Sequence, residues 1–390
     1  MKITSVTPFL LRGDEIYGAH EGDSEATDQG DYLLLVRVRT DEGLEGWADV
    51  ETLGPVAVRV ISGKSMGAMG FRTLEEILVG RDPLAISERW DDMYLASAYY
   101  GRRGVVIHCI SAIDNCLWSI AAQAAAEPLC ELFGGRRRDR LPAYASTLFR
   151  SSPEANARAA AHYVSQGFSA VKFGWGGFGI ESGFDRDCLS AIRDALGPER
   201  TLMVDPGWYV DVDGRPRVRS RVQTVEMLET VSDFDPYWVE DFVHPDRLGD
   251  YRELHAEFPA LRFAAGEQQS TTWDFDRLMT EGHVDVLQPD LSRCGGISTA
   301  LRVAPQAESL GIEIVTHSWL TDFLHAYSLH FLSALPEATW VEFNVAQSAL
   351  SRGVVSDRIH LDVDGSVAVP VGLPTVDEEF ISSHNILDEP

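Results

Sequence analysis

Basic side chains are scarce in this chain of 390 residues. The 33 lysines and arginines stand against 60 acidic residues, which leaves a formal charge of −27 at pH 7. An acidic surface of this kind repels phosphate backbones and anionic lipid headgroups at long range. An uncharged apolar run long enough to span a bilayer is also missing. We therefore expect neither nucleic acid nor a membrane as a partner, and we expect a cytoplasmic protein.

Cysteine is the next scarce residue type, with five scattered copies that never form a CxxC pair. Such a set fits reduced thiols better than a disulfide framework, and it offers neither a redox motif nor a zinc knuckle. Low-complexity sequence is absent as well, and hydrophobic residues make up 45% of the chain. That share can offset the chain entropy lost on folding, which excludes wholesale disorder. At this length we expect two domains, or one large barrel with an appendage.

The first third of the chain combines strand patterns with helix patterns. Residues 32–38 and 46–50 flank the turn signal Asp41-Glu42-Gly43 and have strand-like patterns, which predicts an antiparallel sheet. Residues 73–95 and 105–127 carry apolar side chains at three- and four-residue spacing, which predicts two helices. Together these elements predict an N-terminal α+β domain.

From residue 131 onward, short apolar strands alternate with amphipathic helical stretches. Eight strands are predicted, with ends near Ser146, Lys172, Asp205, Glu240, Gly266, Pro289, Thr316 and Phe343. This alternation implies parallel strands with right-handed crossovers, and eight such units close a (β/α)8 barrel. We predict an α/β protein: a capping domain at 1–130, a modified TIM barrel at 131–360, and a segment at 361–390 that returns to the cap and begins with a hairpin. A doubly wound open sheet is the rival architecture.

Ionisable residues stand at the carboxyl ends of seven successive predicted strands. They are Lys172, Asp205, Glu240, Glu267, Asp290, His317 and Glu342. In a barrel these strand ends converge on the face that holds the active site. Side chains far apart in the sequence are therefore expected to point into one pocket, whereas each of them taken alone could be an ordinary loop residue.

The order of these residues along the strands suggests their chemistry. Asp205, Glu240 and Glu267 come from consecutive strands, and three carboxylates in a dry cleft repel one another unless a cation neutralises them. A set of oxygen ligands alone suits a hard divalent ion, above all Mg²⁺. Asp290 and His317 come from the next two strands, where a carboxylate can hold one imidazole nitrogen and leave the other as a base.

This ordered pattern, together with Asp290 in QPDLSRCGGIS, resembles the enolase superfamily and its mandelate racemase-like branch over nearly the whole chain. The resemblance implies that Asp205, Glu240 and Glu267 bind Mg²⁺ and that Asp290 and His317 form a proton-transfer dyad. It further implies that Glu342 supports the bound carboxylate or the enediolate. In the mechanism that we expect, Lys172 and the bound metal neutralise the substrate carboxylate. A homo-oligomer is implied as well. The expected partner is a small-molecule acid sugar.

The chain departs from the family pattern at one position that bears on the reaction. Where family members often have a Lys-x-Lys motif, Lys172 is kept but Gly174 replaces the second lysine, which is the usual base. A racemase needs a proton-transfer group on both faces of the carbanion, whereas β-elimination can use His317 alone. The pattern therefore favours an acid-sugar dehydratase, a lyase that makes a 2-keto-3-deoxy acid. A racemase or epimerase and a non-catalytic metal-binding scaffold are the alternatives.

A competing motif follows the second predicted barrel strand. Residues 174–179 fit GxGxxG and imitate a dinucleotide fingerprint, although that interpretation leaves the other strand-end residues unexplained. Within this loop Trp175 is either a pocket wall or ordinary packing. Arg102, beside Arg103, is a candidate for binding an anionic substrate or for a salt bridge between cap and barrel. Tyr17 and His20 lie in a loop that the resemblance implies to be a specificity loop, with a plain surface loop as the alternative.

Overall fold

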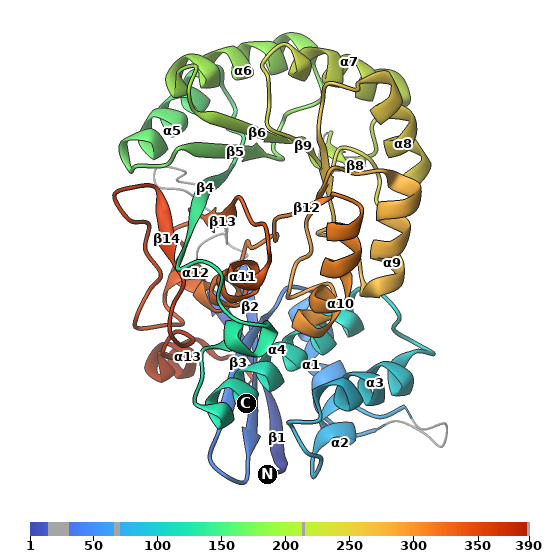
Figure 1. Ribbon diagram of the computed structural model, residues 1–390, viewed down its shortest axis with the longest axis vertical. Coiled ribbons are helices and arrows are strands. Elements are labelled where there is room, and N and C mark those ends of the chain that lie inside the picture. Colours follow the sequence, from blue (N-terminus) through green and yellow to red (C-terminus); the bar gives the residue numbers. More distant parts are fainter. Residues whose placement is uncertain (15–30, 66–70, 213–214, 388–390) are drawn as a thin grey trace.

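The structure is a computed structural model that describes residues 1–14, 31–65, 71–212 and 215–387. Figure 1 shows two layers along its long axis, with the N-terminal sheet and its helices below and a curled parallel sheet above. Helices α5 to α10 surround the outside of the curled sheet. The predicted combination of a barrel and an N-terminal α+β layer is confirmed.

The N-terminal layer is built on three antiparallel strands in the order β1 (Ile3–Gly13), β2 (Asp31–Thr40) and β3 (Glu45–Val50). Its helices are α1 (Gly54–Ile61), α2 (Leu74–Leu78), α3 (Ile86–Ser97) and α4 (Val105–Ala125). The prediction of a single helix over residues 73–95 is wrong, because α2 ends at Leu78 and α3 begins at Ile86. Pro83 lies between them, and its ring and missing N–H disfavour a position inside a helix.

Helix α4 is long and apolar enough to cross a bilayer by length and composition, yet 72% of its most apolar window is buried inside the protein. It packs against β3 on one side and α10 (Gly296–Ser309) on another. Its one aspartate, Asp114, is buried and accepts hydrogen bonds from Ser298 of α10, at 2.8 Å from the backbone nitrogen and 2.6 Å from the hydroxyl. These contacts are those of a core helix.

The upper layer contains eight parallel strands in chain order, and the last of them pairs with the first. They are β4 (Arg140–Leu148), β5 (Ala170–Gly174), β6 (Thr201–Asp205), β9 (Val239–Glu240), β10 (Phe263–Ala265), β11 (Val286–Leu287), β12 (Glu313–Ile314) and β13 (Val341–Asn344). Each strand ends within two residues of its predicted end. Among the described residues, strand pairing is missing only between β12 and β13. An order in which the strands follow the chain and the last strand pairs with the first excludes the doubly wound sheet.

The crossovers between the strands are mostly helical, as predicted. They are α5 (Pro153–Ser165), α6 (Ser182–Leu196), α7 (Arg221–Ser232), α8 (Leu248–Glu257), α9 (Thr271–Arg277) with a π-turn at Leu278–Gly282, α10, and α11 (Asp322–Ala334). Shorter elements are a 3₁₀ turn (Leu129–Phe133), a small hairpin of β7 (Val210–Asp211) with β8 (Pro216–Arg217), and α12 (Ala349–Arg352). The helices bury their apolar faces against the sheet and leave the strand ends open toward the cap.

The C-terminal segment differs from the predicted hairpin. Residues 366–368 form one strand, β14 (Ser366–Ala368), which pairs antiparallel with the start of β4 rather than with the N-terminal sheet. The chain then forms α13 (Glu378–His384), and Ile386 donates a backbone hydrogen bond of 2.9 Å to Leu10 of β1. This end of the chain therefore does touch the N-terminal layer, while the division into three segments at residues 130 and 360 stays a prediction.

An apolar layer fills the barrel interior beneath the strand ends. Its buried members are Tyr144, Ala170, Met203, Trp238, Ala264, Val286 and Val315. Because side chains alternate between the two faces of a strand, a residue two positions later points to the same side. The next inward-facing layer therefore consists of strand-end residues, and all of these are polar except Gly266.

Candidate active site

The polar layer lies directly above this apolar layer and lines a cavity of about 300 Å³. Lys172 follows Ala170 by two residues, Asp205 follows Met203, Glu240 follows Trp238, and His317 follows Val315. Glu342 and Glu267 come from the ends of β13 and β10. Of the seven predicted strand-end residues, five line this cavity: Lys172, Asp205, Glu267, His317 and Glu342. The other two, Glu240 and Asp290, are buried directly behind them and bond to Lys172 and His317.

Lys172 is the cationic centre of one side of the cavity. Its Nζ lies 2.6 Å from an oxygen of Glu240 and 2.9 Å from an oxygen of Glu342. Burial alone would lower the pKa of Lys172, but Glu240 and then Glu342 outweigh that effect and raise it well above its ordinary value. The ammonium group is therefore held in its charged form at the point where we expect the substrate carboxylate.

Glu342 is held by donors on every side. One oxygen accepts hydrogen bonds from the Ser146 hydroxyl at 2.6 Å and from Lys172, and the other accepts from the Ser318 backbone at 2.5 Å. Burial would raise the pKa of Glu342, but Lys172 and His317 lower it below its usual range. Glu342 is therefore an ionised acceptor that orients Lys172.

A cluster of buried carboxylates lies next to Lys172. Burial, followed by the charge of Glu240, raises the pKa of Asp205 well above its ordinary value. Burial, followed by the charges of Glu267 and Asp205, does the same to the pKa of Asp241, whose Oδ2 has no hydrogen-bond partner among the described residues. Glu267 differs, because His317 and Arg293 outweigh its burial and lower its pKa well below its ordinary value. The charges that nearby cations leave unbalanced are therefore those of Asp205 and Asp241.

The cluster fits a hard divalent cation. Its donors are carboxylate oxygens from three consecutive strands, and one buried oxygen is unsatisfied. Oxygen-only donors of this kind suit Mg²⁺. Glu240 is the most engaged of the predicted ligands, because Trp238 and Gln288 donate to its second oxygen at 2.9 Å and 2.8 Å. Asp241, which the sequence analysis did not single out, is a further candidate ligand beside it.

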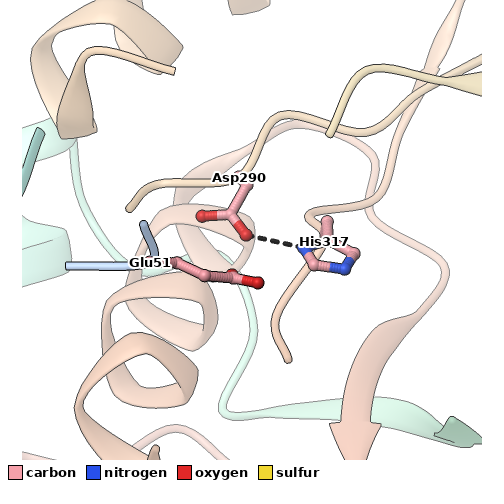
Figure 2. A group of neighbouring side chains, drawn as sticks. All are labelled: Glu51, Asp290 and His317. Carbon is pink, nitrogen blue, oxygen red and sulfur yellow. Dashed lines mark hydrogen bonds and ion pairs between the residues drawn. The ribbon is translucent and has the colours of Figure 1, made fainter. Parts of the chain in front are cut away.

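Asp290 and His317 form the predicted pair at the far side of the cavity. The imidazole Nδ1 lies 2.6 Å from Asp290, drawn as a dashed line in Figure 2, and Nε2 lies 2.8 Å from Glu267. Ser292 fixes Asp290 through its backbone nitrogen and hydroxyl, both at 2.6 Å. Burial would lower the pKa of His317, but Glu267 and Glu342 outweigh it and raise the pKa well above its usual range.

Glu51 of the N-terminal layer also reaches this dyad, and the sequence analysis missed it. Figure 2 shows its carboxylate beneath Asp290 and pointing toward His317, and one donor atom from each of the three lies within 4.8 Å of the others. That spacing could hold a metal ion. However, Glu51 is already paired with the guanidinium of Arg293, which also lies 3.4 Å from Glu267. Burial still raises the pKa of Glu51 despite Arg293, and its second oxygen has no hydrogen-bond partner among the described residues. Glu51, Asp290 and His317 and the carboxylates near Asp205 are therefore both candidate metal sites, and only the second is an all-oxygen set.

The four predicted substrate-binding residues have different outcomes. Trp175 lines the cavity. Arg102 is exposed and lies outside the cavity lining, whereas its neighbour Arg103 forms the salt bridge between cap and barrel with Asp246, at 2.9 Å, and with Asp274. Tyr17 and His20 lie outside the described residues.

The GxGxxG match does not form a phosphate site. The backbone nitrogen of Gly179, just before α6, donates to the carboxylate of Asp185 at 3.0 Å, and Arg219 donates to the Gly179 carbonyl at 3.1 Å. A protein carboxylate thus occupies the place at the helix N-terminus where a dinucleotide would put its pyrophosphate. The dinucleotide interpretation is therefore excluded by both this contact and the barrel topology.

Comparison with known proteins adds two family matches. Residues 23–134 match the mandelate racemase/muconate lactonizing enzyme N-terminal domain, and residues 154–373 match the enolase C-terminal domain-like family. The chain is 29% identical to D-galactarolactone cycloisomerase of Agrobacterium fabrum over 95% of both chains. It is 27% identical to L-rhamnonate dehydratase of Saccharopolyspora erythraea, covering 80% of this chain and 72% of that one. The crystal structure of 3,6-anhydro-D-galactonate cycloisomerase from Zobellia galactanivorans superposes with a TM-score of 0.83 at 25% identity, covering 99% of both chains.

Proposed function

Because the chain belongs to the mandelate racemase/muconate lactonizing enzyme family of the enolase superfamily, we propose that it is an Mg²⁺-dependent acid-sugar dehydratase. In this proposal it removes the proton α to a carboxylate and eliminates the β-hydroxyl to give a 2-keto-3-deoxy acid. The observation that carries the proposal is the pair of His317 and Asp290, which are 2.6 Å apart at a cavity that also holds the buried cation Lys172. The dehydratase among the relatives supports it.

The residues of the chain have separate tasks in this reaction. Lys172 binds the substrate carboxylate, and Glu342 orients Lys172. In the structure Nε2 of His317 is paired with Glu267, so His317 would become a base once Glu267 is engaged as a metal ligand and no longer holds a proton on Nε2. His317, fixed by Asp290 at Nδ1, then accepts the α-proton at Nε2 and delivers it to the departing hydroxyl, which leaves as water. The enol that remains becomes the ketone by tautomerisation. Mg²⁺, held by Asp205, Glu240 and Glu267 with Asp241 beside them, would supply positive charge that lowers the cost of the dianionic enediolate.

A second candidate is a cycloisomerase, in which the β-substituent is the oxygen of a closed sugar ring. One observation favours it: Lys172, Ser146 and Ser318 hold Glu342 as an acceptor, so among the described residues His317 is the one acid that the mechanism above uses. A lactone expels a carboxylate, which leaves without a proton and needs no acid at all. Two similar proteins are named as cycloisomerases. A racemase is less well supported, since Gly174 offers no second base.

The test is a screen of sugar acids and their lactones with Mg²⁺, in which 2-keto-3-deoxy products are detected and α-deuterium uptake in D₂O is followed by NMR. We expect product from one or a few compounds, and we expect His317→Asn to abolish it while Mg²⁺ binding is retained. Exchange of the α-proton without product would favour a racemase. If neither exchange nor product occurs, the scaffold interpretation gains and the proposed function is wrong.

The setting of the enzyme is part of the same proposal. We place it in the cytoplasm as a homo-oligomer that acts on a small-molecule sugar acid. Light scattering of the purified protein checks the oligomeric state.

A further inference from the structure

The side of the cavity across from the base is aromatic. Trp175 follows β5, while Trp208 and Tyr209 follow β6, and all three line the cavity. We call these three residues the aromatic wall. In the order of the eight strands β6 is third and β12 is seventh, so the wall and His317 stand on opposite sides of the ring. A substrate bound between them has one face toward the base and the other toward the wall.

Backbone geometry fixes the position of Trp175. Its φ of 51° lies in the left-handed region, which a bulky residue rarely adopts, and its backbone nitrogen donates to the carbonyl of Asp205 at 2.7 Å. The indole ring packs onto Gly207, where an added Cβ would lie 2.7 Å from ring atoms. Strain of this kind persists only where the surroundings enforce it, and it is common in ligand-binding sites.

The three rings also support one another. The ring centroids of Trp175 and Tyr209 are 5.0 Å apart, and those of Trp208 and Tyr209 are 4.8 Å apart. Trp208 in turn packs edge-on against His244, with centroids 5.0 Å apart. The wall is therefore a preformed surface, so a ligand that packs on it does not have to order these side chains first.

The wall stands where a second proton-transfer group would otherwise be. Gly174 ends β5 directly before Trp175, and a Cβ added there would lie 2.9 Å from Oδ2 of Asp205. A lysine cannot enter at this position without moving a candidate metal ligand. On this side of the cavity the chain offers apolar contact area in place of a base.

A closed sugar ring presents a face of C–H groups that can pack flat on an aromatic ring, whereas an open-chain polyol exposes hydroxyls on all sides. We propose that the aromatic wall binds the C–H face of a closed ring, so that the substrate is a cyclic sugar acid, such as a lactone or an anhydro sugar acid. This inference rests on the proposed function for the position of the substrate carboxylate. It goes further by choosing between the two candidates: in these ring compounds the β-substituent is the ring oxygen, so the aromatic wall favours the cycloisomerase over the dehydratase.

The experiment compares galactarate and glucarate, each with its own monolactone, binding to the Mg²⁺-loaded protein. Affinities come from calorimetry, and saturation-transfer NMR reports which ligand protons lie against the protein. We expect at least one lactone to bind about tenfold more tightly than its open-chain acid, with the strongest saturation on its ring C–H protons. Trp175→Leu should remove this preference, and Trp175→Phe should keep much of it because a ring remains.

The control variant is Trp273→Leu, since Trp273 is 57% exposed, packs on Tyr94 and lies outside the cavity lining. It should bind every ligand as the wild type does. The inference is wrong if no pair shows a preference for the ring, or if Trp175→Leu weakens both members of a pair equally. Should the open-chain acids still give 2-keto-3-deoxy products in that case, the proposed function stands without the wall. Absence of both binding and product would overturn both.

Discussion

The environment of Asp205 shows how one missing side chain can shape the site. Gly174 pairs with Asp205 in the parallel ladder, and a Cβ at Gly174 would lie 2.9 Å from its Oδ2. We predict that Gly174→Ala pushes the Asp205 carboxylate out of place and weakens Mg²⁺ binding about tenfold. A calorimetric Mg²⁺ titration measures this effect. Gly177→Ala is the matched control, because a Cβ at Gly177 meets nothing within 4 Å. Equal affinity in both variants would contradict the assignment of Asp205 as a ligand.

Glu51 is the residue through which the N-terminal layer acts on the dyad. Among the described residues, its partner Arg293 has one other ion pair, with Glu267 at 3.4 Å. We predict that Glu51→Gln lowers kcat/KM about tenfold, because it leaves a buried guanidinium poorly paired beside His317. Steady-state kinetics on the identified substrate measure the change, and circular dichroism verifies the fold.

A second glutamate of the same layer provides the control for that variant. Glu45 lies in β3 and pairs with Arg39 at 2.9 Å, away from the dyad. Glu45→Gln should therefore leave kcat/KM unchanged. Equal losses in the two variants would mean that the strand, rather than the Glu51 carboxylate, matters for activity.

Much of the cavity could be predicted at this scale because its residues stand at strand ends, two positions after the residues of the apolar layer in the barrel interior. The same two-residue spacing could have identified Gln288, which follows Val286 of that layer. Asp241 lies next to a predicted ligand and faces the cluster only because of its backbone conformation, with a φ of 44°. Glu51 has no local signal, since its position depends on how two layers pack.

At the scale of elements, the N-terminus of α10 is capped by the neighbouring helix α4. Asp114 accepts from the backbone nitrogen of Ser298 at 2.8 Å, and Asn115 accepts from that of Ile297 at 3.0 Å. Both side chains are buried. Burial raises the pKa of Asp114 to about 7, which shows how costly its charge is there. The two helices are therefore joined by hydrogen bonds that neither sequence pattern could reveal.

We predict that Asp114→Ala lowers the free energy of unfolding by about 1–3 kcal/mol, because it leaves a buried backbone donor of α10 without a partner. Urea denaturation followed by circular dichroism measures the loss. Asp91→Ala on α3 is the control, since Asp91 is exposed. If both variants were equally stable, the capping contact would contribute nothing to stability.

Element types were predicted better than element partners. The eight barrel strands follow from the alternation of strand and helix patterns, which repeats along the chain and so reinforces itself. The local pattern also predicts the strand β14, but it does not predict its partner. That partner is the start of β4, which is distant in the sequence and lies beside β14 only in the folded protein. Pro83 is a local signal for the break between α2 and α3. The helical spacing of apolar residues on both sides of it led to the prediction of one continuous helix.

At the scale of the whole molecule, acid stability reflects histidines that folding buries in their neutral form. Burial lowers the pKa of His325 to about 3, and it lowers those of His108 and His330 to about 4. The unfolded chain has its histidine pKa values near about 6.5. Below that pH these histidines bind protons in the unfolded state but not in the folded state. The free energy of unfolding therefore decreases as the pH falls from about 6.5 toward 4.

Two buried aspartates act in the opposite direction. Burial raises the pKa of Asp49 and of Asp114 to about 7. The folded state keeps their protons where the unfolded state has lost them, so these groups reduce stability as the pH rises from about 4 toward 7. The net pH dependence is therefore a difference, and single variants are needed to separate the two contributions.

We predict that His325→Phe flattens the acid side of the stability curve. In the wild type, protonation of the unfolded chain at this one residue costs up to about 1.4 kcal/mol of stability per pH unit below pH 6.5. Phenylalanine removes that proton uptake, and it also removes a buried Nε2 that has no hydrogen-bond partner among the described residues, while its ring can keep the contact with Phe343. Urea unfolding at pH 7, 6 and 5 measures the slope. A slope equal to that of the wild type would mean that His325 becomes protonated within the folded protein, and its burial would then not govern acid stability.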